Sequence, residues 1–495
     1  MSAGTDGRKP RRGGNFDASR SAPRKRPLPG KASQDRGGNH ARIPAGADGF
    51  VPDGYSAGDR PGLGARLVAA KLLSAIVDAK TSADGLLDPT GGHPGLRALE
   101  PRDQGLVKAI ILTALRFRGT IDRALDACLD RPLPPNAASL KHILHVGAAQ
   151  ILYLNVPDSA AVDLAVAAAN IDSRSQRFAG MINAVLRRLS REKEALSGIG
   201  QPSDNVPEWL MRRLVATYGP ERAQAIALAH MTPAPLDLTV KAGAAGWAER
   251  LGGTQLGRST VRLGEFDGAV TGLAGFAEGD WWVQDAAAAL PAQLFGDLTG
   301  RRVADLCAAP GGKTAQLILA GGKVTAFDIN ANRMKRLKAN LERLSLEAET
   351  IVGDVAAHEP EAPFDAILLD APCSSTGTIR RHPDVAYTKD LAEIEKLAGV
   401  QARLLSVAAD MLAVGGRLVF SNCSLDRLEG EDLVETFLSA RPDFVREPVQ
   451  PEELPGFAFA VTAAGDLRTT PEMMGGGEGP GGGLDGFYAA RLRRI

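Results

Sequence analysis

The chain has 495 residues, too many for one compact core, and its length predicts roughly two to four domains. Its hydrophobic content of 44% and charged content of 23% are ordinary for a globular protein, and no stretch is apolar for long enough to span a membrane. The formal net charge is zero, but residues 1–45 carry 11 Lys and Arg against 3 Asp and Glu, a net charge of +8. Such a tail indicates either an acidic partner such as nucleic acid or a segment that only aids solubility.

Residues 1–60 are rich in Gly, Pro, Ser and Arg and offer little apolar surface to bury, so we expect a disordered basic tail. From residue 61 to 196 apolar residues recur at helical spacing without strand signals, which predicts an all-α domain. The last helix of that domain carries Arg187, Arg188 and Arg191, with Arg174 and Arg177 just before it. These arginines fit phosphate contacts or, equally simply, a solvated helix face.

The remaining chain predicts two more units. Helical and alternating patterns mix over residues 207–289, which indicates a small α+β module. Strands and helices then alternate over residues 290–495, as expected of an α/β domain with a parallel, doubly wound sheet. The Gly-rich stretch 473–486 predicts a mobile loop.

The four cysteines are free of any C-x-x-C pair, and the N-terminal residues contain no apolar h-region of the kind found in a secretory signal. We therefore expect a soluble cytoplasmic protein with reduced thiols, no metal site and no membrane contact. Cys373 and Cys423 each follow an apolar run that predicts a buried strand. Ligands gather beyond the carboxyl ends of strands in such sheets, so these thiols fit covalent chemistry, although structural burial explains them about as well.

A glycine-containing loop, Ala308-Ala-Pro-Gly-Gly-Lys313, follows the predicted strand that ends at Cys307. A P-loop would require glycine where Cys307 stands, and the G-x-G-x-x-G of dinucleotide-binding loops is absent. Asp328 lies 23 positions after Asp305, at the tip of the next strand, where a carboxylate can bind a ribose diol. With Asp354 placed for an adenine edge, these acids favour S-adenosylmethionine over the two phosphate-bearing cofactors.

Two resemblances add to these patterns. Glu100-Pro-Arg-Asp, Leu115-Arg-Phe-Arg-Gly-Thr and Phe178-Ala-Gly-Met-Ile-Asn-Ala-Val-Leu-Arg-Arg resemble the helical RNA-binding domain of the antitermination factor NusB. Leu306-Cys-Ala-Ala-Pro-Gly-Gly-Lys-Thr, Asp370-Ala-Pro-Cys-Ser-Ser-Thr-Gly, Arg381-His-Pro-Asp and Ser421-Asn-Cys-Ser occur in the order found in the Nol/Nop/Sun RNA cytosine-5-methyltransferases, which the chain resembles. The two together imply a Rossmann-like methyltransferase domain behind a NusB-like domain and the small module.

The second resemblance implies roles for individual residues. Cys423 is the nucleophile, Cys373 assists product release, Asp370 holds the cytosine edge, and Lys313 helps bind the substrate or order the pocket. The S-adenosylmethionine site is implied at Cys307, Ala308, Ala309, Pro310, Gly311, Gly312, Lys313, Asp328, Asp354 and Asp370. For the side chain of Cys307 and for Cys128 we expect packing, and for the loop around His382 we expect a bracing role rather than general-base catalysis.

The implied function is methylation of cytosine C5 in small-subunit (16S) ribosomal RNA by a monomeric enzyme, through a covalent adduct with cytosine C6. Two alternatives remain: a transfer RNA substrate, and a non-catalytic RNA-binding factor in ribosome assembly. Two positions depart from the family pattern: Asn422 stands where Thr is usual, and Gly430 stands where Asn is usual between two glutamates. Neither change removes a reactive group.

Overall fold

The computed structural model describes residues 60–88, 91–134, 137–264, 268–475 and 481–495. The predicted basic tail, residues 1–60, lies outside the described residues except for its last one, and so does part of the predicted loop 473–486. Across the described ranges, no helix is both long and apolar enough to cross a membrane.

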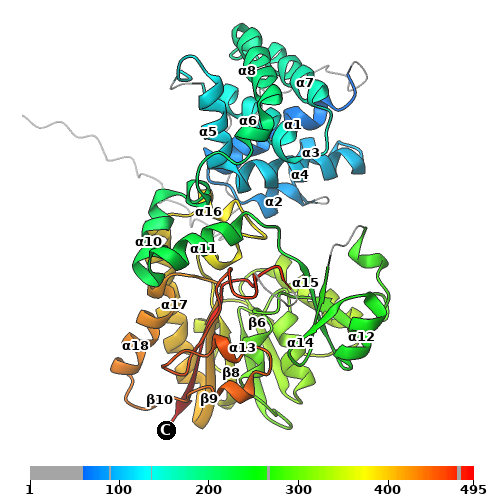
Figure 1. Ribbon diagram of the computed structural model, residues 1–495. Helices are drawn as coiled ribbons and strands as arrows, with labels where there is room; N and C mark the ends of the chain where they lie inside the picture. Colours follow the sequence, from blue (N-terminus) through cyan, green and yellow to red (C-terminus); the bar gives the residue numbers. More distant parts are fainter. Residues whose placement is uncertain (1–59, 89–90, 135–136, 265–267, 476–480) are drawn as a thin grey trace, which may run out of the picture. The chain divides into compact units, whose positions relative to one another are not determined.

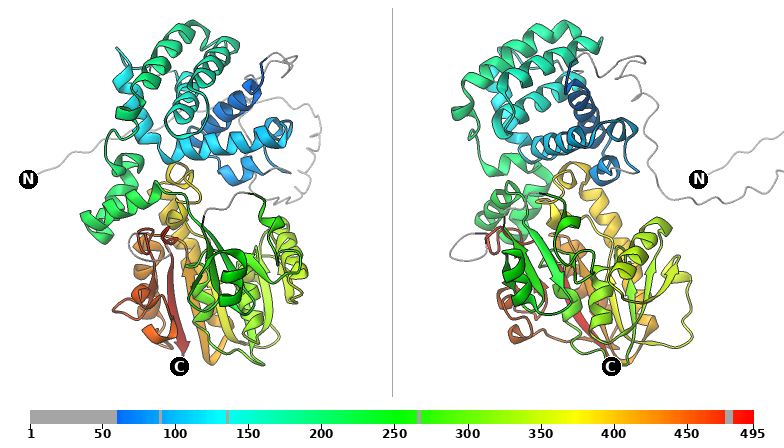
Figure 2. Two further views of the ribbon diagram at one scale, coloured as in Figure 1. Left: turned by 45° about the vertical axis from the view of Figure 1, so that its right-hand side comes forward. Right: turned by 90° about the vertical axis from the view of Figure 1, so that its right-hand side faces the viewer.

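The regular elements described within residues 63–196 are all helices, blue to green in Figures 1 and 2, as predicted. Helix α6 is buried along most of its length and packs against α1, α4, α5, α7 and α8. The bounds are α1 Leu63–Val77, α2 Ala83–Leu87, α3 Pro94–Arg97, α4 Pro101–Arg116, α5 Arg118–Cys128, α6 Ala138–Tyr153, α7 Asp158–Ile171, α8 Ala179–Arg191 and α9 Lys193–Leu196. Helix α4 begins where Pro101 occupies the first turn, a position that needs no N–H donor.

Residues 207–289 pack in two different places. Helices α10 (Glu208–Tyr218) and α11 (Pro220–His230) share an apolar core with Ile379, Val385 and Leu425 of the C-terminal region. The four strands that follow form an antiparallel sheet in the order β2-β3-β1-β4, with its own small core under helix α12. Their bounds are β1 Leu236–Val240, α12 Ala244–Leu251, β2 Thr254–Leu256, β3 Thr260–Leu263 and β4 Trp281–Val283.

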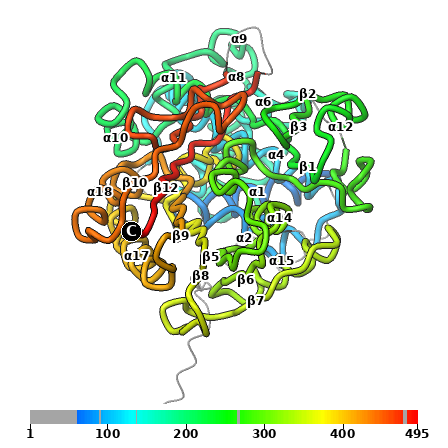
Figure 3. The backbone as a smooth tube through the Cα atoms, turned by 90° about the horizontal axis from the view of Figure 1, so that it is seen from below, coloured from blue at the N-terminus to red at the C-terminus, as the bar shows by residue number. Residues whose placement is uncertain are grey.

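The C-terminal region is built on an eight-stranded sheet in the order β10-β12-β9-β8-β5-β6-β7, with β11 paired to β12. Figure 3 shows the neighbouring strands fanning from β10 to β7. The strands are β5 Arg302–Leu306, β6 Lys323–Asp328, β7 Glu349–Val352, β8 Phe364–Asp370, β9 Leu412–Asn422, β10 Phe444–Arg446, β11 Leu467–Arg468 and β12 Tyr488–Arg494. The helices are α13 Leu290–Gln293, α14 Gly312–Leu319, α15 Ala331–Arg343, α16 Val385–Thr388, α17 Leu391–Met411 and α18 Glu431–Ala440.

This sheet is covered on both faces, because alternate residues of each strand enter different cores. On β8, Ile367 and Leu369 pack with α17 and α18, whereas Ala366 and Leu368 pack with α13 and α14. The α/β class is as predicted, but the sheet is mixed rather than fully parallel. Strand β12 runs antiparallel to β9, and β10 and β11 run antiparallel to β12. A strand's direction depends on how the chain returns to the sheet, which an apolar run alone does not encode.

Candidate active site

The two candidate thiols come together at the carboxyl edge of the sheet. Strands β8 and β9 are parallel neighbours, with Asp370 opposite Ser421 in the register, so the segments that follow them leave the sheet side by side. Cys373 and Cys423 lie on those segments, and their Sγ atoms are 3.4 Å apart. Both side chains are half-buried and line one cavity. The expectation that both thiols reach one site therefore agrees with the geometry.

The two thiols differ in their electrostatic surroundings. The pKa of Cys423 is lowered, first by the hydrogen bond from Cys373, and also by the Ser375 hydroxyl and the positive charge of Lys313. The pKa of Cys373 is raised well above its ordinary value by its hydrogen bond to Cys423, by burial and by the charge of Glu429. The pair thus favours a thiolate on Cys423 and a protonated thiol on Cys373, and the thiolate is the nucleophilic form of cysteine.

Lys313 and Asp370 form an ion pair beside the thiols. The Lys313 Nζ atom donates to Asp370 Oδ2 at 2.8 Å, and the Ser421 hydroxyl donates to Asp370 Oδ1 at 2.9 Å. Lys313 belongs to the first turn of α14, and its Nζ also lies 5.0 Å from the centre of the Phe487 ring. The carboxylate is therefore held by a cation and a hydroxyl while 30% of its side-chain surface stays exposed.

The cavity that contains both thiols has a volume of about 310 Å³, within the usual size range for small-molecule sites. It is lined by Cys307, Phe327, Asp328, Ile329, Arg333, Gly353, Asp354, Val355, Asp370, Ala371, Pro372, Cys373, Ser375, Val400, Arg403, Leu404 and Cys423. Four residues of the predicted cofactor site are in this cavity: Cys307, Asp328, Asp354 and Asp370. The lining also includes Ile329, which is 72% exposed although apolar.

These residues fit S-adenosylmethionine. Asp328 is buried at the tip of β6, accepts hydrogen bonds from the backbone N–H groups of Ala309 and Asn330, and is 3.2 Å from Arg333. Asp354 follows β7 and is more exposed, with Arg403 at 3.4 Å. The two acids are placed for a ribose diol and an adenine amine, and the exposed Ile329 side chain offers an apolar surface for a planar base.

The rest of the predicted cofactor loop lines a second, adjoining cavity of about 440 Å³. Ala308, Ala309, Pro310, Gly311, Gly312 and Lys313 all border it, together with Trp282 and Phe487, and Asp370 belongs to both cavities. Gly311 has a φ of 102°, and a Cβ atom there would lie 3.0 Å from Leu337 Cγ. This glycine therefore permits close packing of the loop against α15, rather than approach to a ligand.

The other two cysteines occupy apolar surroundings. Burial raises the pKa of Cys307 to about 12, so its thiol stays protonated although it borders the first cavity. Cys128 is buried in the helical core, where burial also raises its pKa. Both side chains fit the packing role expected of them.

The segment around His382 braces its surroundings. His382 Nδ1 lies 3.1 Å from Asp84 of α2, and hydrogen bonding to Asp84 raises the His382 pKa. Arg381 reaches both Asp285 after β4, at 2.5 Å, and Asp485 before β12, at 3.0 Å. The histidine lies in neither of the two cavities described above, which agrees with the bracing role expected of this segment.

Sequence reasoning missed a buried polar cluster behind the thiols. The carboxylate of Glu429 accepts hydrogen bonds from Ser374 and Ser424, each the residue immediately after a candidate cysteine. It also missed Phe487 beside Lys313, because the C-terminal run reads as an ordinary strand. The acidic motif after Cys423 was the available signal for Glu429.

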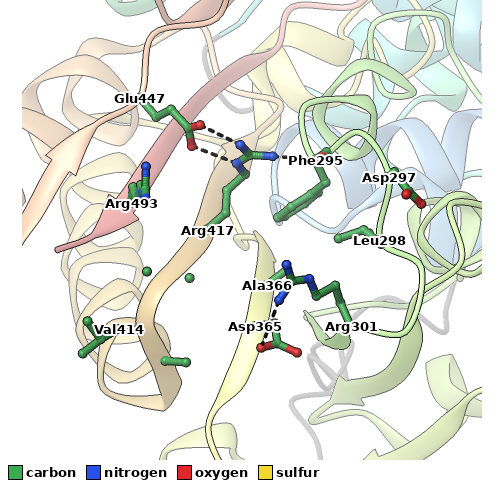
Figure 4. Close-up of a pocket in the computed structure, with 13 residues that line it drawn as sticks. Phe295, Asp297, Leu298, Arg301, Asp365, Ala366, Val414, Arg417, Glu447 and Arg493 are labelled. Carbon is green, nitrogen blue, oxygen red and sulfur yellow. Dashed lines mark hydrogen bonds and ion pairs between the residues drawn. The ribbon is translucent and has the colours of Figure 1, made fainter.

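A third cavity, of about 380 Å³, lies at the opposite end of the sheet, where β5, β8 and β9 begin (Figure 4). Four of its charged side chains form two pairs: Arg417 donates two hydrogen bonds to Glu447, and Arg301 lies 3.9 Å from Asp365. It contains neither a cysteine nor a residue of the cofactor loop. The arrangement indicates a structural role, fastening β9 to the segment before β11.

Two family models match the chain. The model for the 16S rRNA methyltransferase RsmB/F covers residues 296–493, and the NusB family model covers residues 63–191. The fold and the site therefore define a methyltransferase that carries a NusB-type helical domain, and S-adenosylmethionine is its cofactor.

The curated relatives narrow this class to a family. The Ribosomal RNA small subunit methyltransferase B of Xanthomonas campestris is 37% identical over 451 residues, 87% of this chain and 97% of that relative. The protein of the same name from Pseudomonas putida is 35% identical, over 87% of this chain and 98% of the relative. The chain belongs to the ribosomal RNA small subunit methyltransferase B family. The crystal structure of PH0851 shares the fold, with a TM-score of 0.62 at 22% identity over 88% of this chain and 99% of that one.

Proposed function

We propose that this protein methylates C5 of a cytosine in small-subunit ribosomal RNA, with S-adenosylmethionine as methyl donor. The observation that carries the proposal is the pair of thiols 3.4 Å apart, next to the Lys313–Asp370 ion pair, in a cavity that also contains Asp328 and Asp354. The names of the relatives support ribosomal RNA as the substrate class. The NusB-type domain supports contact between this protein and RNA.

The proposed reaction begins with addition of the Cys423 thiolate to cytosine C6. C5 of a cytosine ring is too weak a nucleophile to take a methyl group directly, and addition at C6 makes C5 electron-rich. The ring nitrogens gain negative charge in this step. The Asp370 carboxylate accepts a hydrogen bond from the N4 amino group on the cytosine edge, and the adjacent Lys313 ammonium offsets the added charge.

S-adenosylmethionine, which Asp328 and Asp354 would hold, would supply the methyl group that C5 takes up. Loss of the C5 proton to a base and departure of the Cys423 sulfur from C6 complete the reaction. In this step we assign Cys373 to assist the leaving sulfur, since the two Sγ atoms lie within hydrogen-bonding distance, 3.4 Å, in the free protein. The same hydrogen bond that lowers the pKa of the nucleophile therefore stabilises it as a leaving group.

The target base has to leave its stack to reach the thiols. C5 and C6 of a stacked cytosine are covered by its neighbours, so we expect the base to be flipped out or taken from a loop. The second cavity shares Asp370 with the first, and we assign it to the RNA chain that carries the base. Its Trp282 and Phe487 come from different parts of the chain, one before and one after the cofactor loop.

Substitution of the two cysteines tests this proposal. Cys423→Ser abolishes methylation of small-subunit RNA, because a hydroxyl is not ionised near neutral pH. Cys373→Ala binds RNA and accumulates a covalent protein–RNA adduct, visible as a slow band on a denaturing gel. Bisulfite sequencing of RNA from a deletion strain identifies the cytosine. Full methylation by Cys423→Ser would contradict the role of Cys423. If the deletion strain lost a methyl group from transfer RNA alone, the substrate would be transfer RNA instead of ribosomal RNA.

A further inference from the structure

Glu429 is a fully buried carboxylate whose hydrogen-bonding capacity is used almost entirely on the two cysteine segments. Its Oε1 atom accepts from the Ser374 backbone N–H at 2.9 Å and from Gln401 Nε2 at 3.0 Å. Its Oε2 atom accepts from the hydroxyls of Ser374 and Ser424. Four donors contact this one carboxylate, and none of its surface is exposed, so a polar group of this shape is needed to satisfy its partners.

The partners of Glu429 sit directly beside the thiols. Ser374 follows Cys373 and Ser424 follows Cys423, so the carboxylate joins the two segments one residue away from each sulfur. Gln401 of α17 also donates to the Pro372 carbonyl at 2.9 Å, which extends the same connection to the residue before Cys373. Movement of either segment would therefore break buried hydrogen bonds, and each donor or acceptor left alone costs about 1–3 kcal/mol.

Asn422 fixes Glu429 from the other side. Its Nδ2 group donates to the Glu429 backbone carbonyl, and its Oδ1 atom accepts from the Ser424 N–H at 2.9 Å. A threonine hydroxyl is shorter than this amide and cannot make both contacts at once. The unusual residue before the nucleophile thus belongs to the same cluster.

We propose that Glu429 is a positioning residue that holds the Cys373 and Cys423 segments together and thereby sets the distance between the two thiols. It borders neither the thiol cavity nor the adjoining one, so it acts through the serines rather than on the substrate. The consequence of this positioning for methyl transfer rests on the function proposed above. The effect of Glu429 on the thiol distance is independent of that function and can be measured without RNA or cofactor.

Oxidation to a disulfide reports the thiol distance directly. Diamide takes two electrons: the Cys423 thiolate adds to its N=N bond, and the Cys373 sulfur then displaces that nitrogen as the disulfide forms and the hydrazine product leaves with both protons. The rate of the second step depends on how close the two sulfurs are. Mass spectrometry of the purified full-length protein follows the loss of two hydrogens, and the Cys373→Ala variant gives the background from Cys128 and Cys307.

Three variants make the test. Glu429→Ala should form the disulfide at least about tenfold more slowly than the wild type, because the serines lose their common acceptor. Glu429→Gln should stay within about twofold, since its amide oxygen still accepts from Ser374 and Gln401 while its NH₂ donates to both hydroxyls. Glu447→Ala is the matched control: it removes a carboxylate that binds Arg417 at the far end of the sheet, and should leave the rate unchanged.

Ser424→Ala keeps the test open should Glu429→Ala fail to fold, because it removes one donor and leaves the carboxylate in place. We expect an intermediate fall in the disulfide rate for this variant. In methylation assays Glu429→Ala should lower kcat while KM for RNA stays unchanged. Wild-type disulfide rates in folded Glu429→Ala, or in Ser424→Ala should the former not fold, would overturn the inference. If the wild-type protein did not methylate RNA but Glu429→Ala still formed the disulfide slowly, the proposed function would be refuted and the positioning role of Glu429 would stand.

Discussion

Asn422 stands immediately before the proposed nucleophile, at a position where the RNA cytosine-5-methyltransferases that the chain resembles usually have threonine. Its amide makes one donated and one accepted hydrogen bond in a fully buried cluster. Gly430, the second departure, has Arg468 where a side chain would begin: a Cβ atom there would lie 2.8 Å from Arg468 Nη2. Both departures are therefore accommodated by local packing, and neither disturbs the thiols.

Asn422→Thr should cost stability more than activity. A threonine hydroxyl can replace only one of the two hydrogen bonds, so we expect a loss of about 1–3 kcal/mol in the free energy of unfolding, with methylation retained within a few-fold. Guanidinium denaturation followed by fluorescence measures the loss. Asn340→Thr, which removes an exposed hydrogen bond to the Pro310 carbonyl, is the control and should change stability by less than about 0.5 kcal/mol. Equal losses in the two variants would contradict this role for Asn422.

The reactivity of Cys423 should depend on pH in a definite direction. Its pKa is lowered by the hydrogen bond from Cys373, so the thiolate, the form that iodoacetamide alkylates, persists to lower pH than in an ordinary cysteine. Removal of that donor in Cys373→Ala raises the pKa and should slow alkylation of Cys423 several-fold near neutral pH, moving the whole pH profile upward. Peptide mass spectrometry at a series of pH values measures the profile. A shift toward lower pH would show that the hydrogen bond has the opposite effect.

At the scale of residues, the reactive groups could be predicted from the sequence, but the buried carboxylate that holds them in place could not. Cys373, Cys423 and Asp370 each follow or end a recognisable apolar run, so their convergence at one sheet edge could be predicted. Glu429 could not be assigned in the same way, since its partners lie as far as 55 positions away along the chain. Its role depends on two segments meeting in the folded protein, and only the order of β8 and β9 in the sheet brings them together.

At the scale of elements, Arg381 links its own segment to two others, and all three line the second cavity. It reaches Asp285 after β4 and Asp485 before β12, and both carboxylates are almost fully buried. Arg381→Met leaves these two acids with less positive charge in an apolar setting, and we expect a loss of about 3–5 kcal/mol in stability. Thermal or denaturant unfolding measures the change.

Arg212→Met is the control for Arg381→Met. Arg212 pairs with Glu208 on an exposed face of α10, where both side chains are more than three-quarters exposed. Surface pairs of this kind contribute about 0–1 kcal/mol. Similar losses in the two variants would mean that the buried charges around Arg381 are not what holds these segments.

The strands β6, β7 and β8 coincide with short apolar runs, because each run is flanked by polar or turn-forming residues. Strand β9 begins at Leu412, ahead of the apolar run that follows Gly416, since pairing with β8 extends it through two glycines. Helix α11 went unpredicted despite the Gly219-Pro220 start signal, and β2, β10 and β11 are too short to show alternation. The direction of the strands was harder to predict than their bounds: β12 runs antiparallel to β9, whereas a parallel sheet was expected.

At the scale of the whole molecule, the helical region has a core of its own. Apart from Tyr387, the apolar residues of that core come from residues 63–199 as far as the chain is described. We therefore predict that a fragment of residues 60–200 folds alone and gives a cooperative thermal transition by circular dichroism. A broad, non-cooperative loss of helix would show that this region depends on the rest of the chain. The domain boundaries remain predictions until such fragments are made.

The central claim is that Cys423, and not Cys373, bonds to the cytosine ring. Small-subunit RNA containing 5-fluorocytosine tests it most directly, because fluorine at C5 cannot leave as a proton does and the adduct persists after methyl transfer. The protein is incubated with this RNA and S-adenosylmethionine, digested, and the nucleotide-bearing peptide is identified by mass spectrometry. The account predicts a single modified peptide with the nucleotide on Cys423. A nucleotide on Cys373, or no adduct on either cysteine with the fluorinated RNA from a protein that methylates normal RNA, would contradict it.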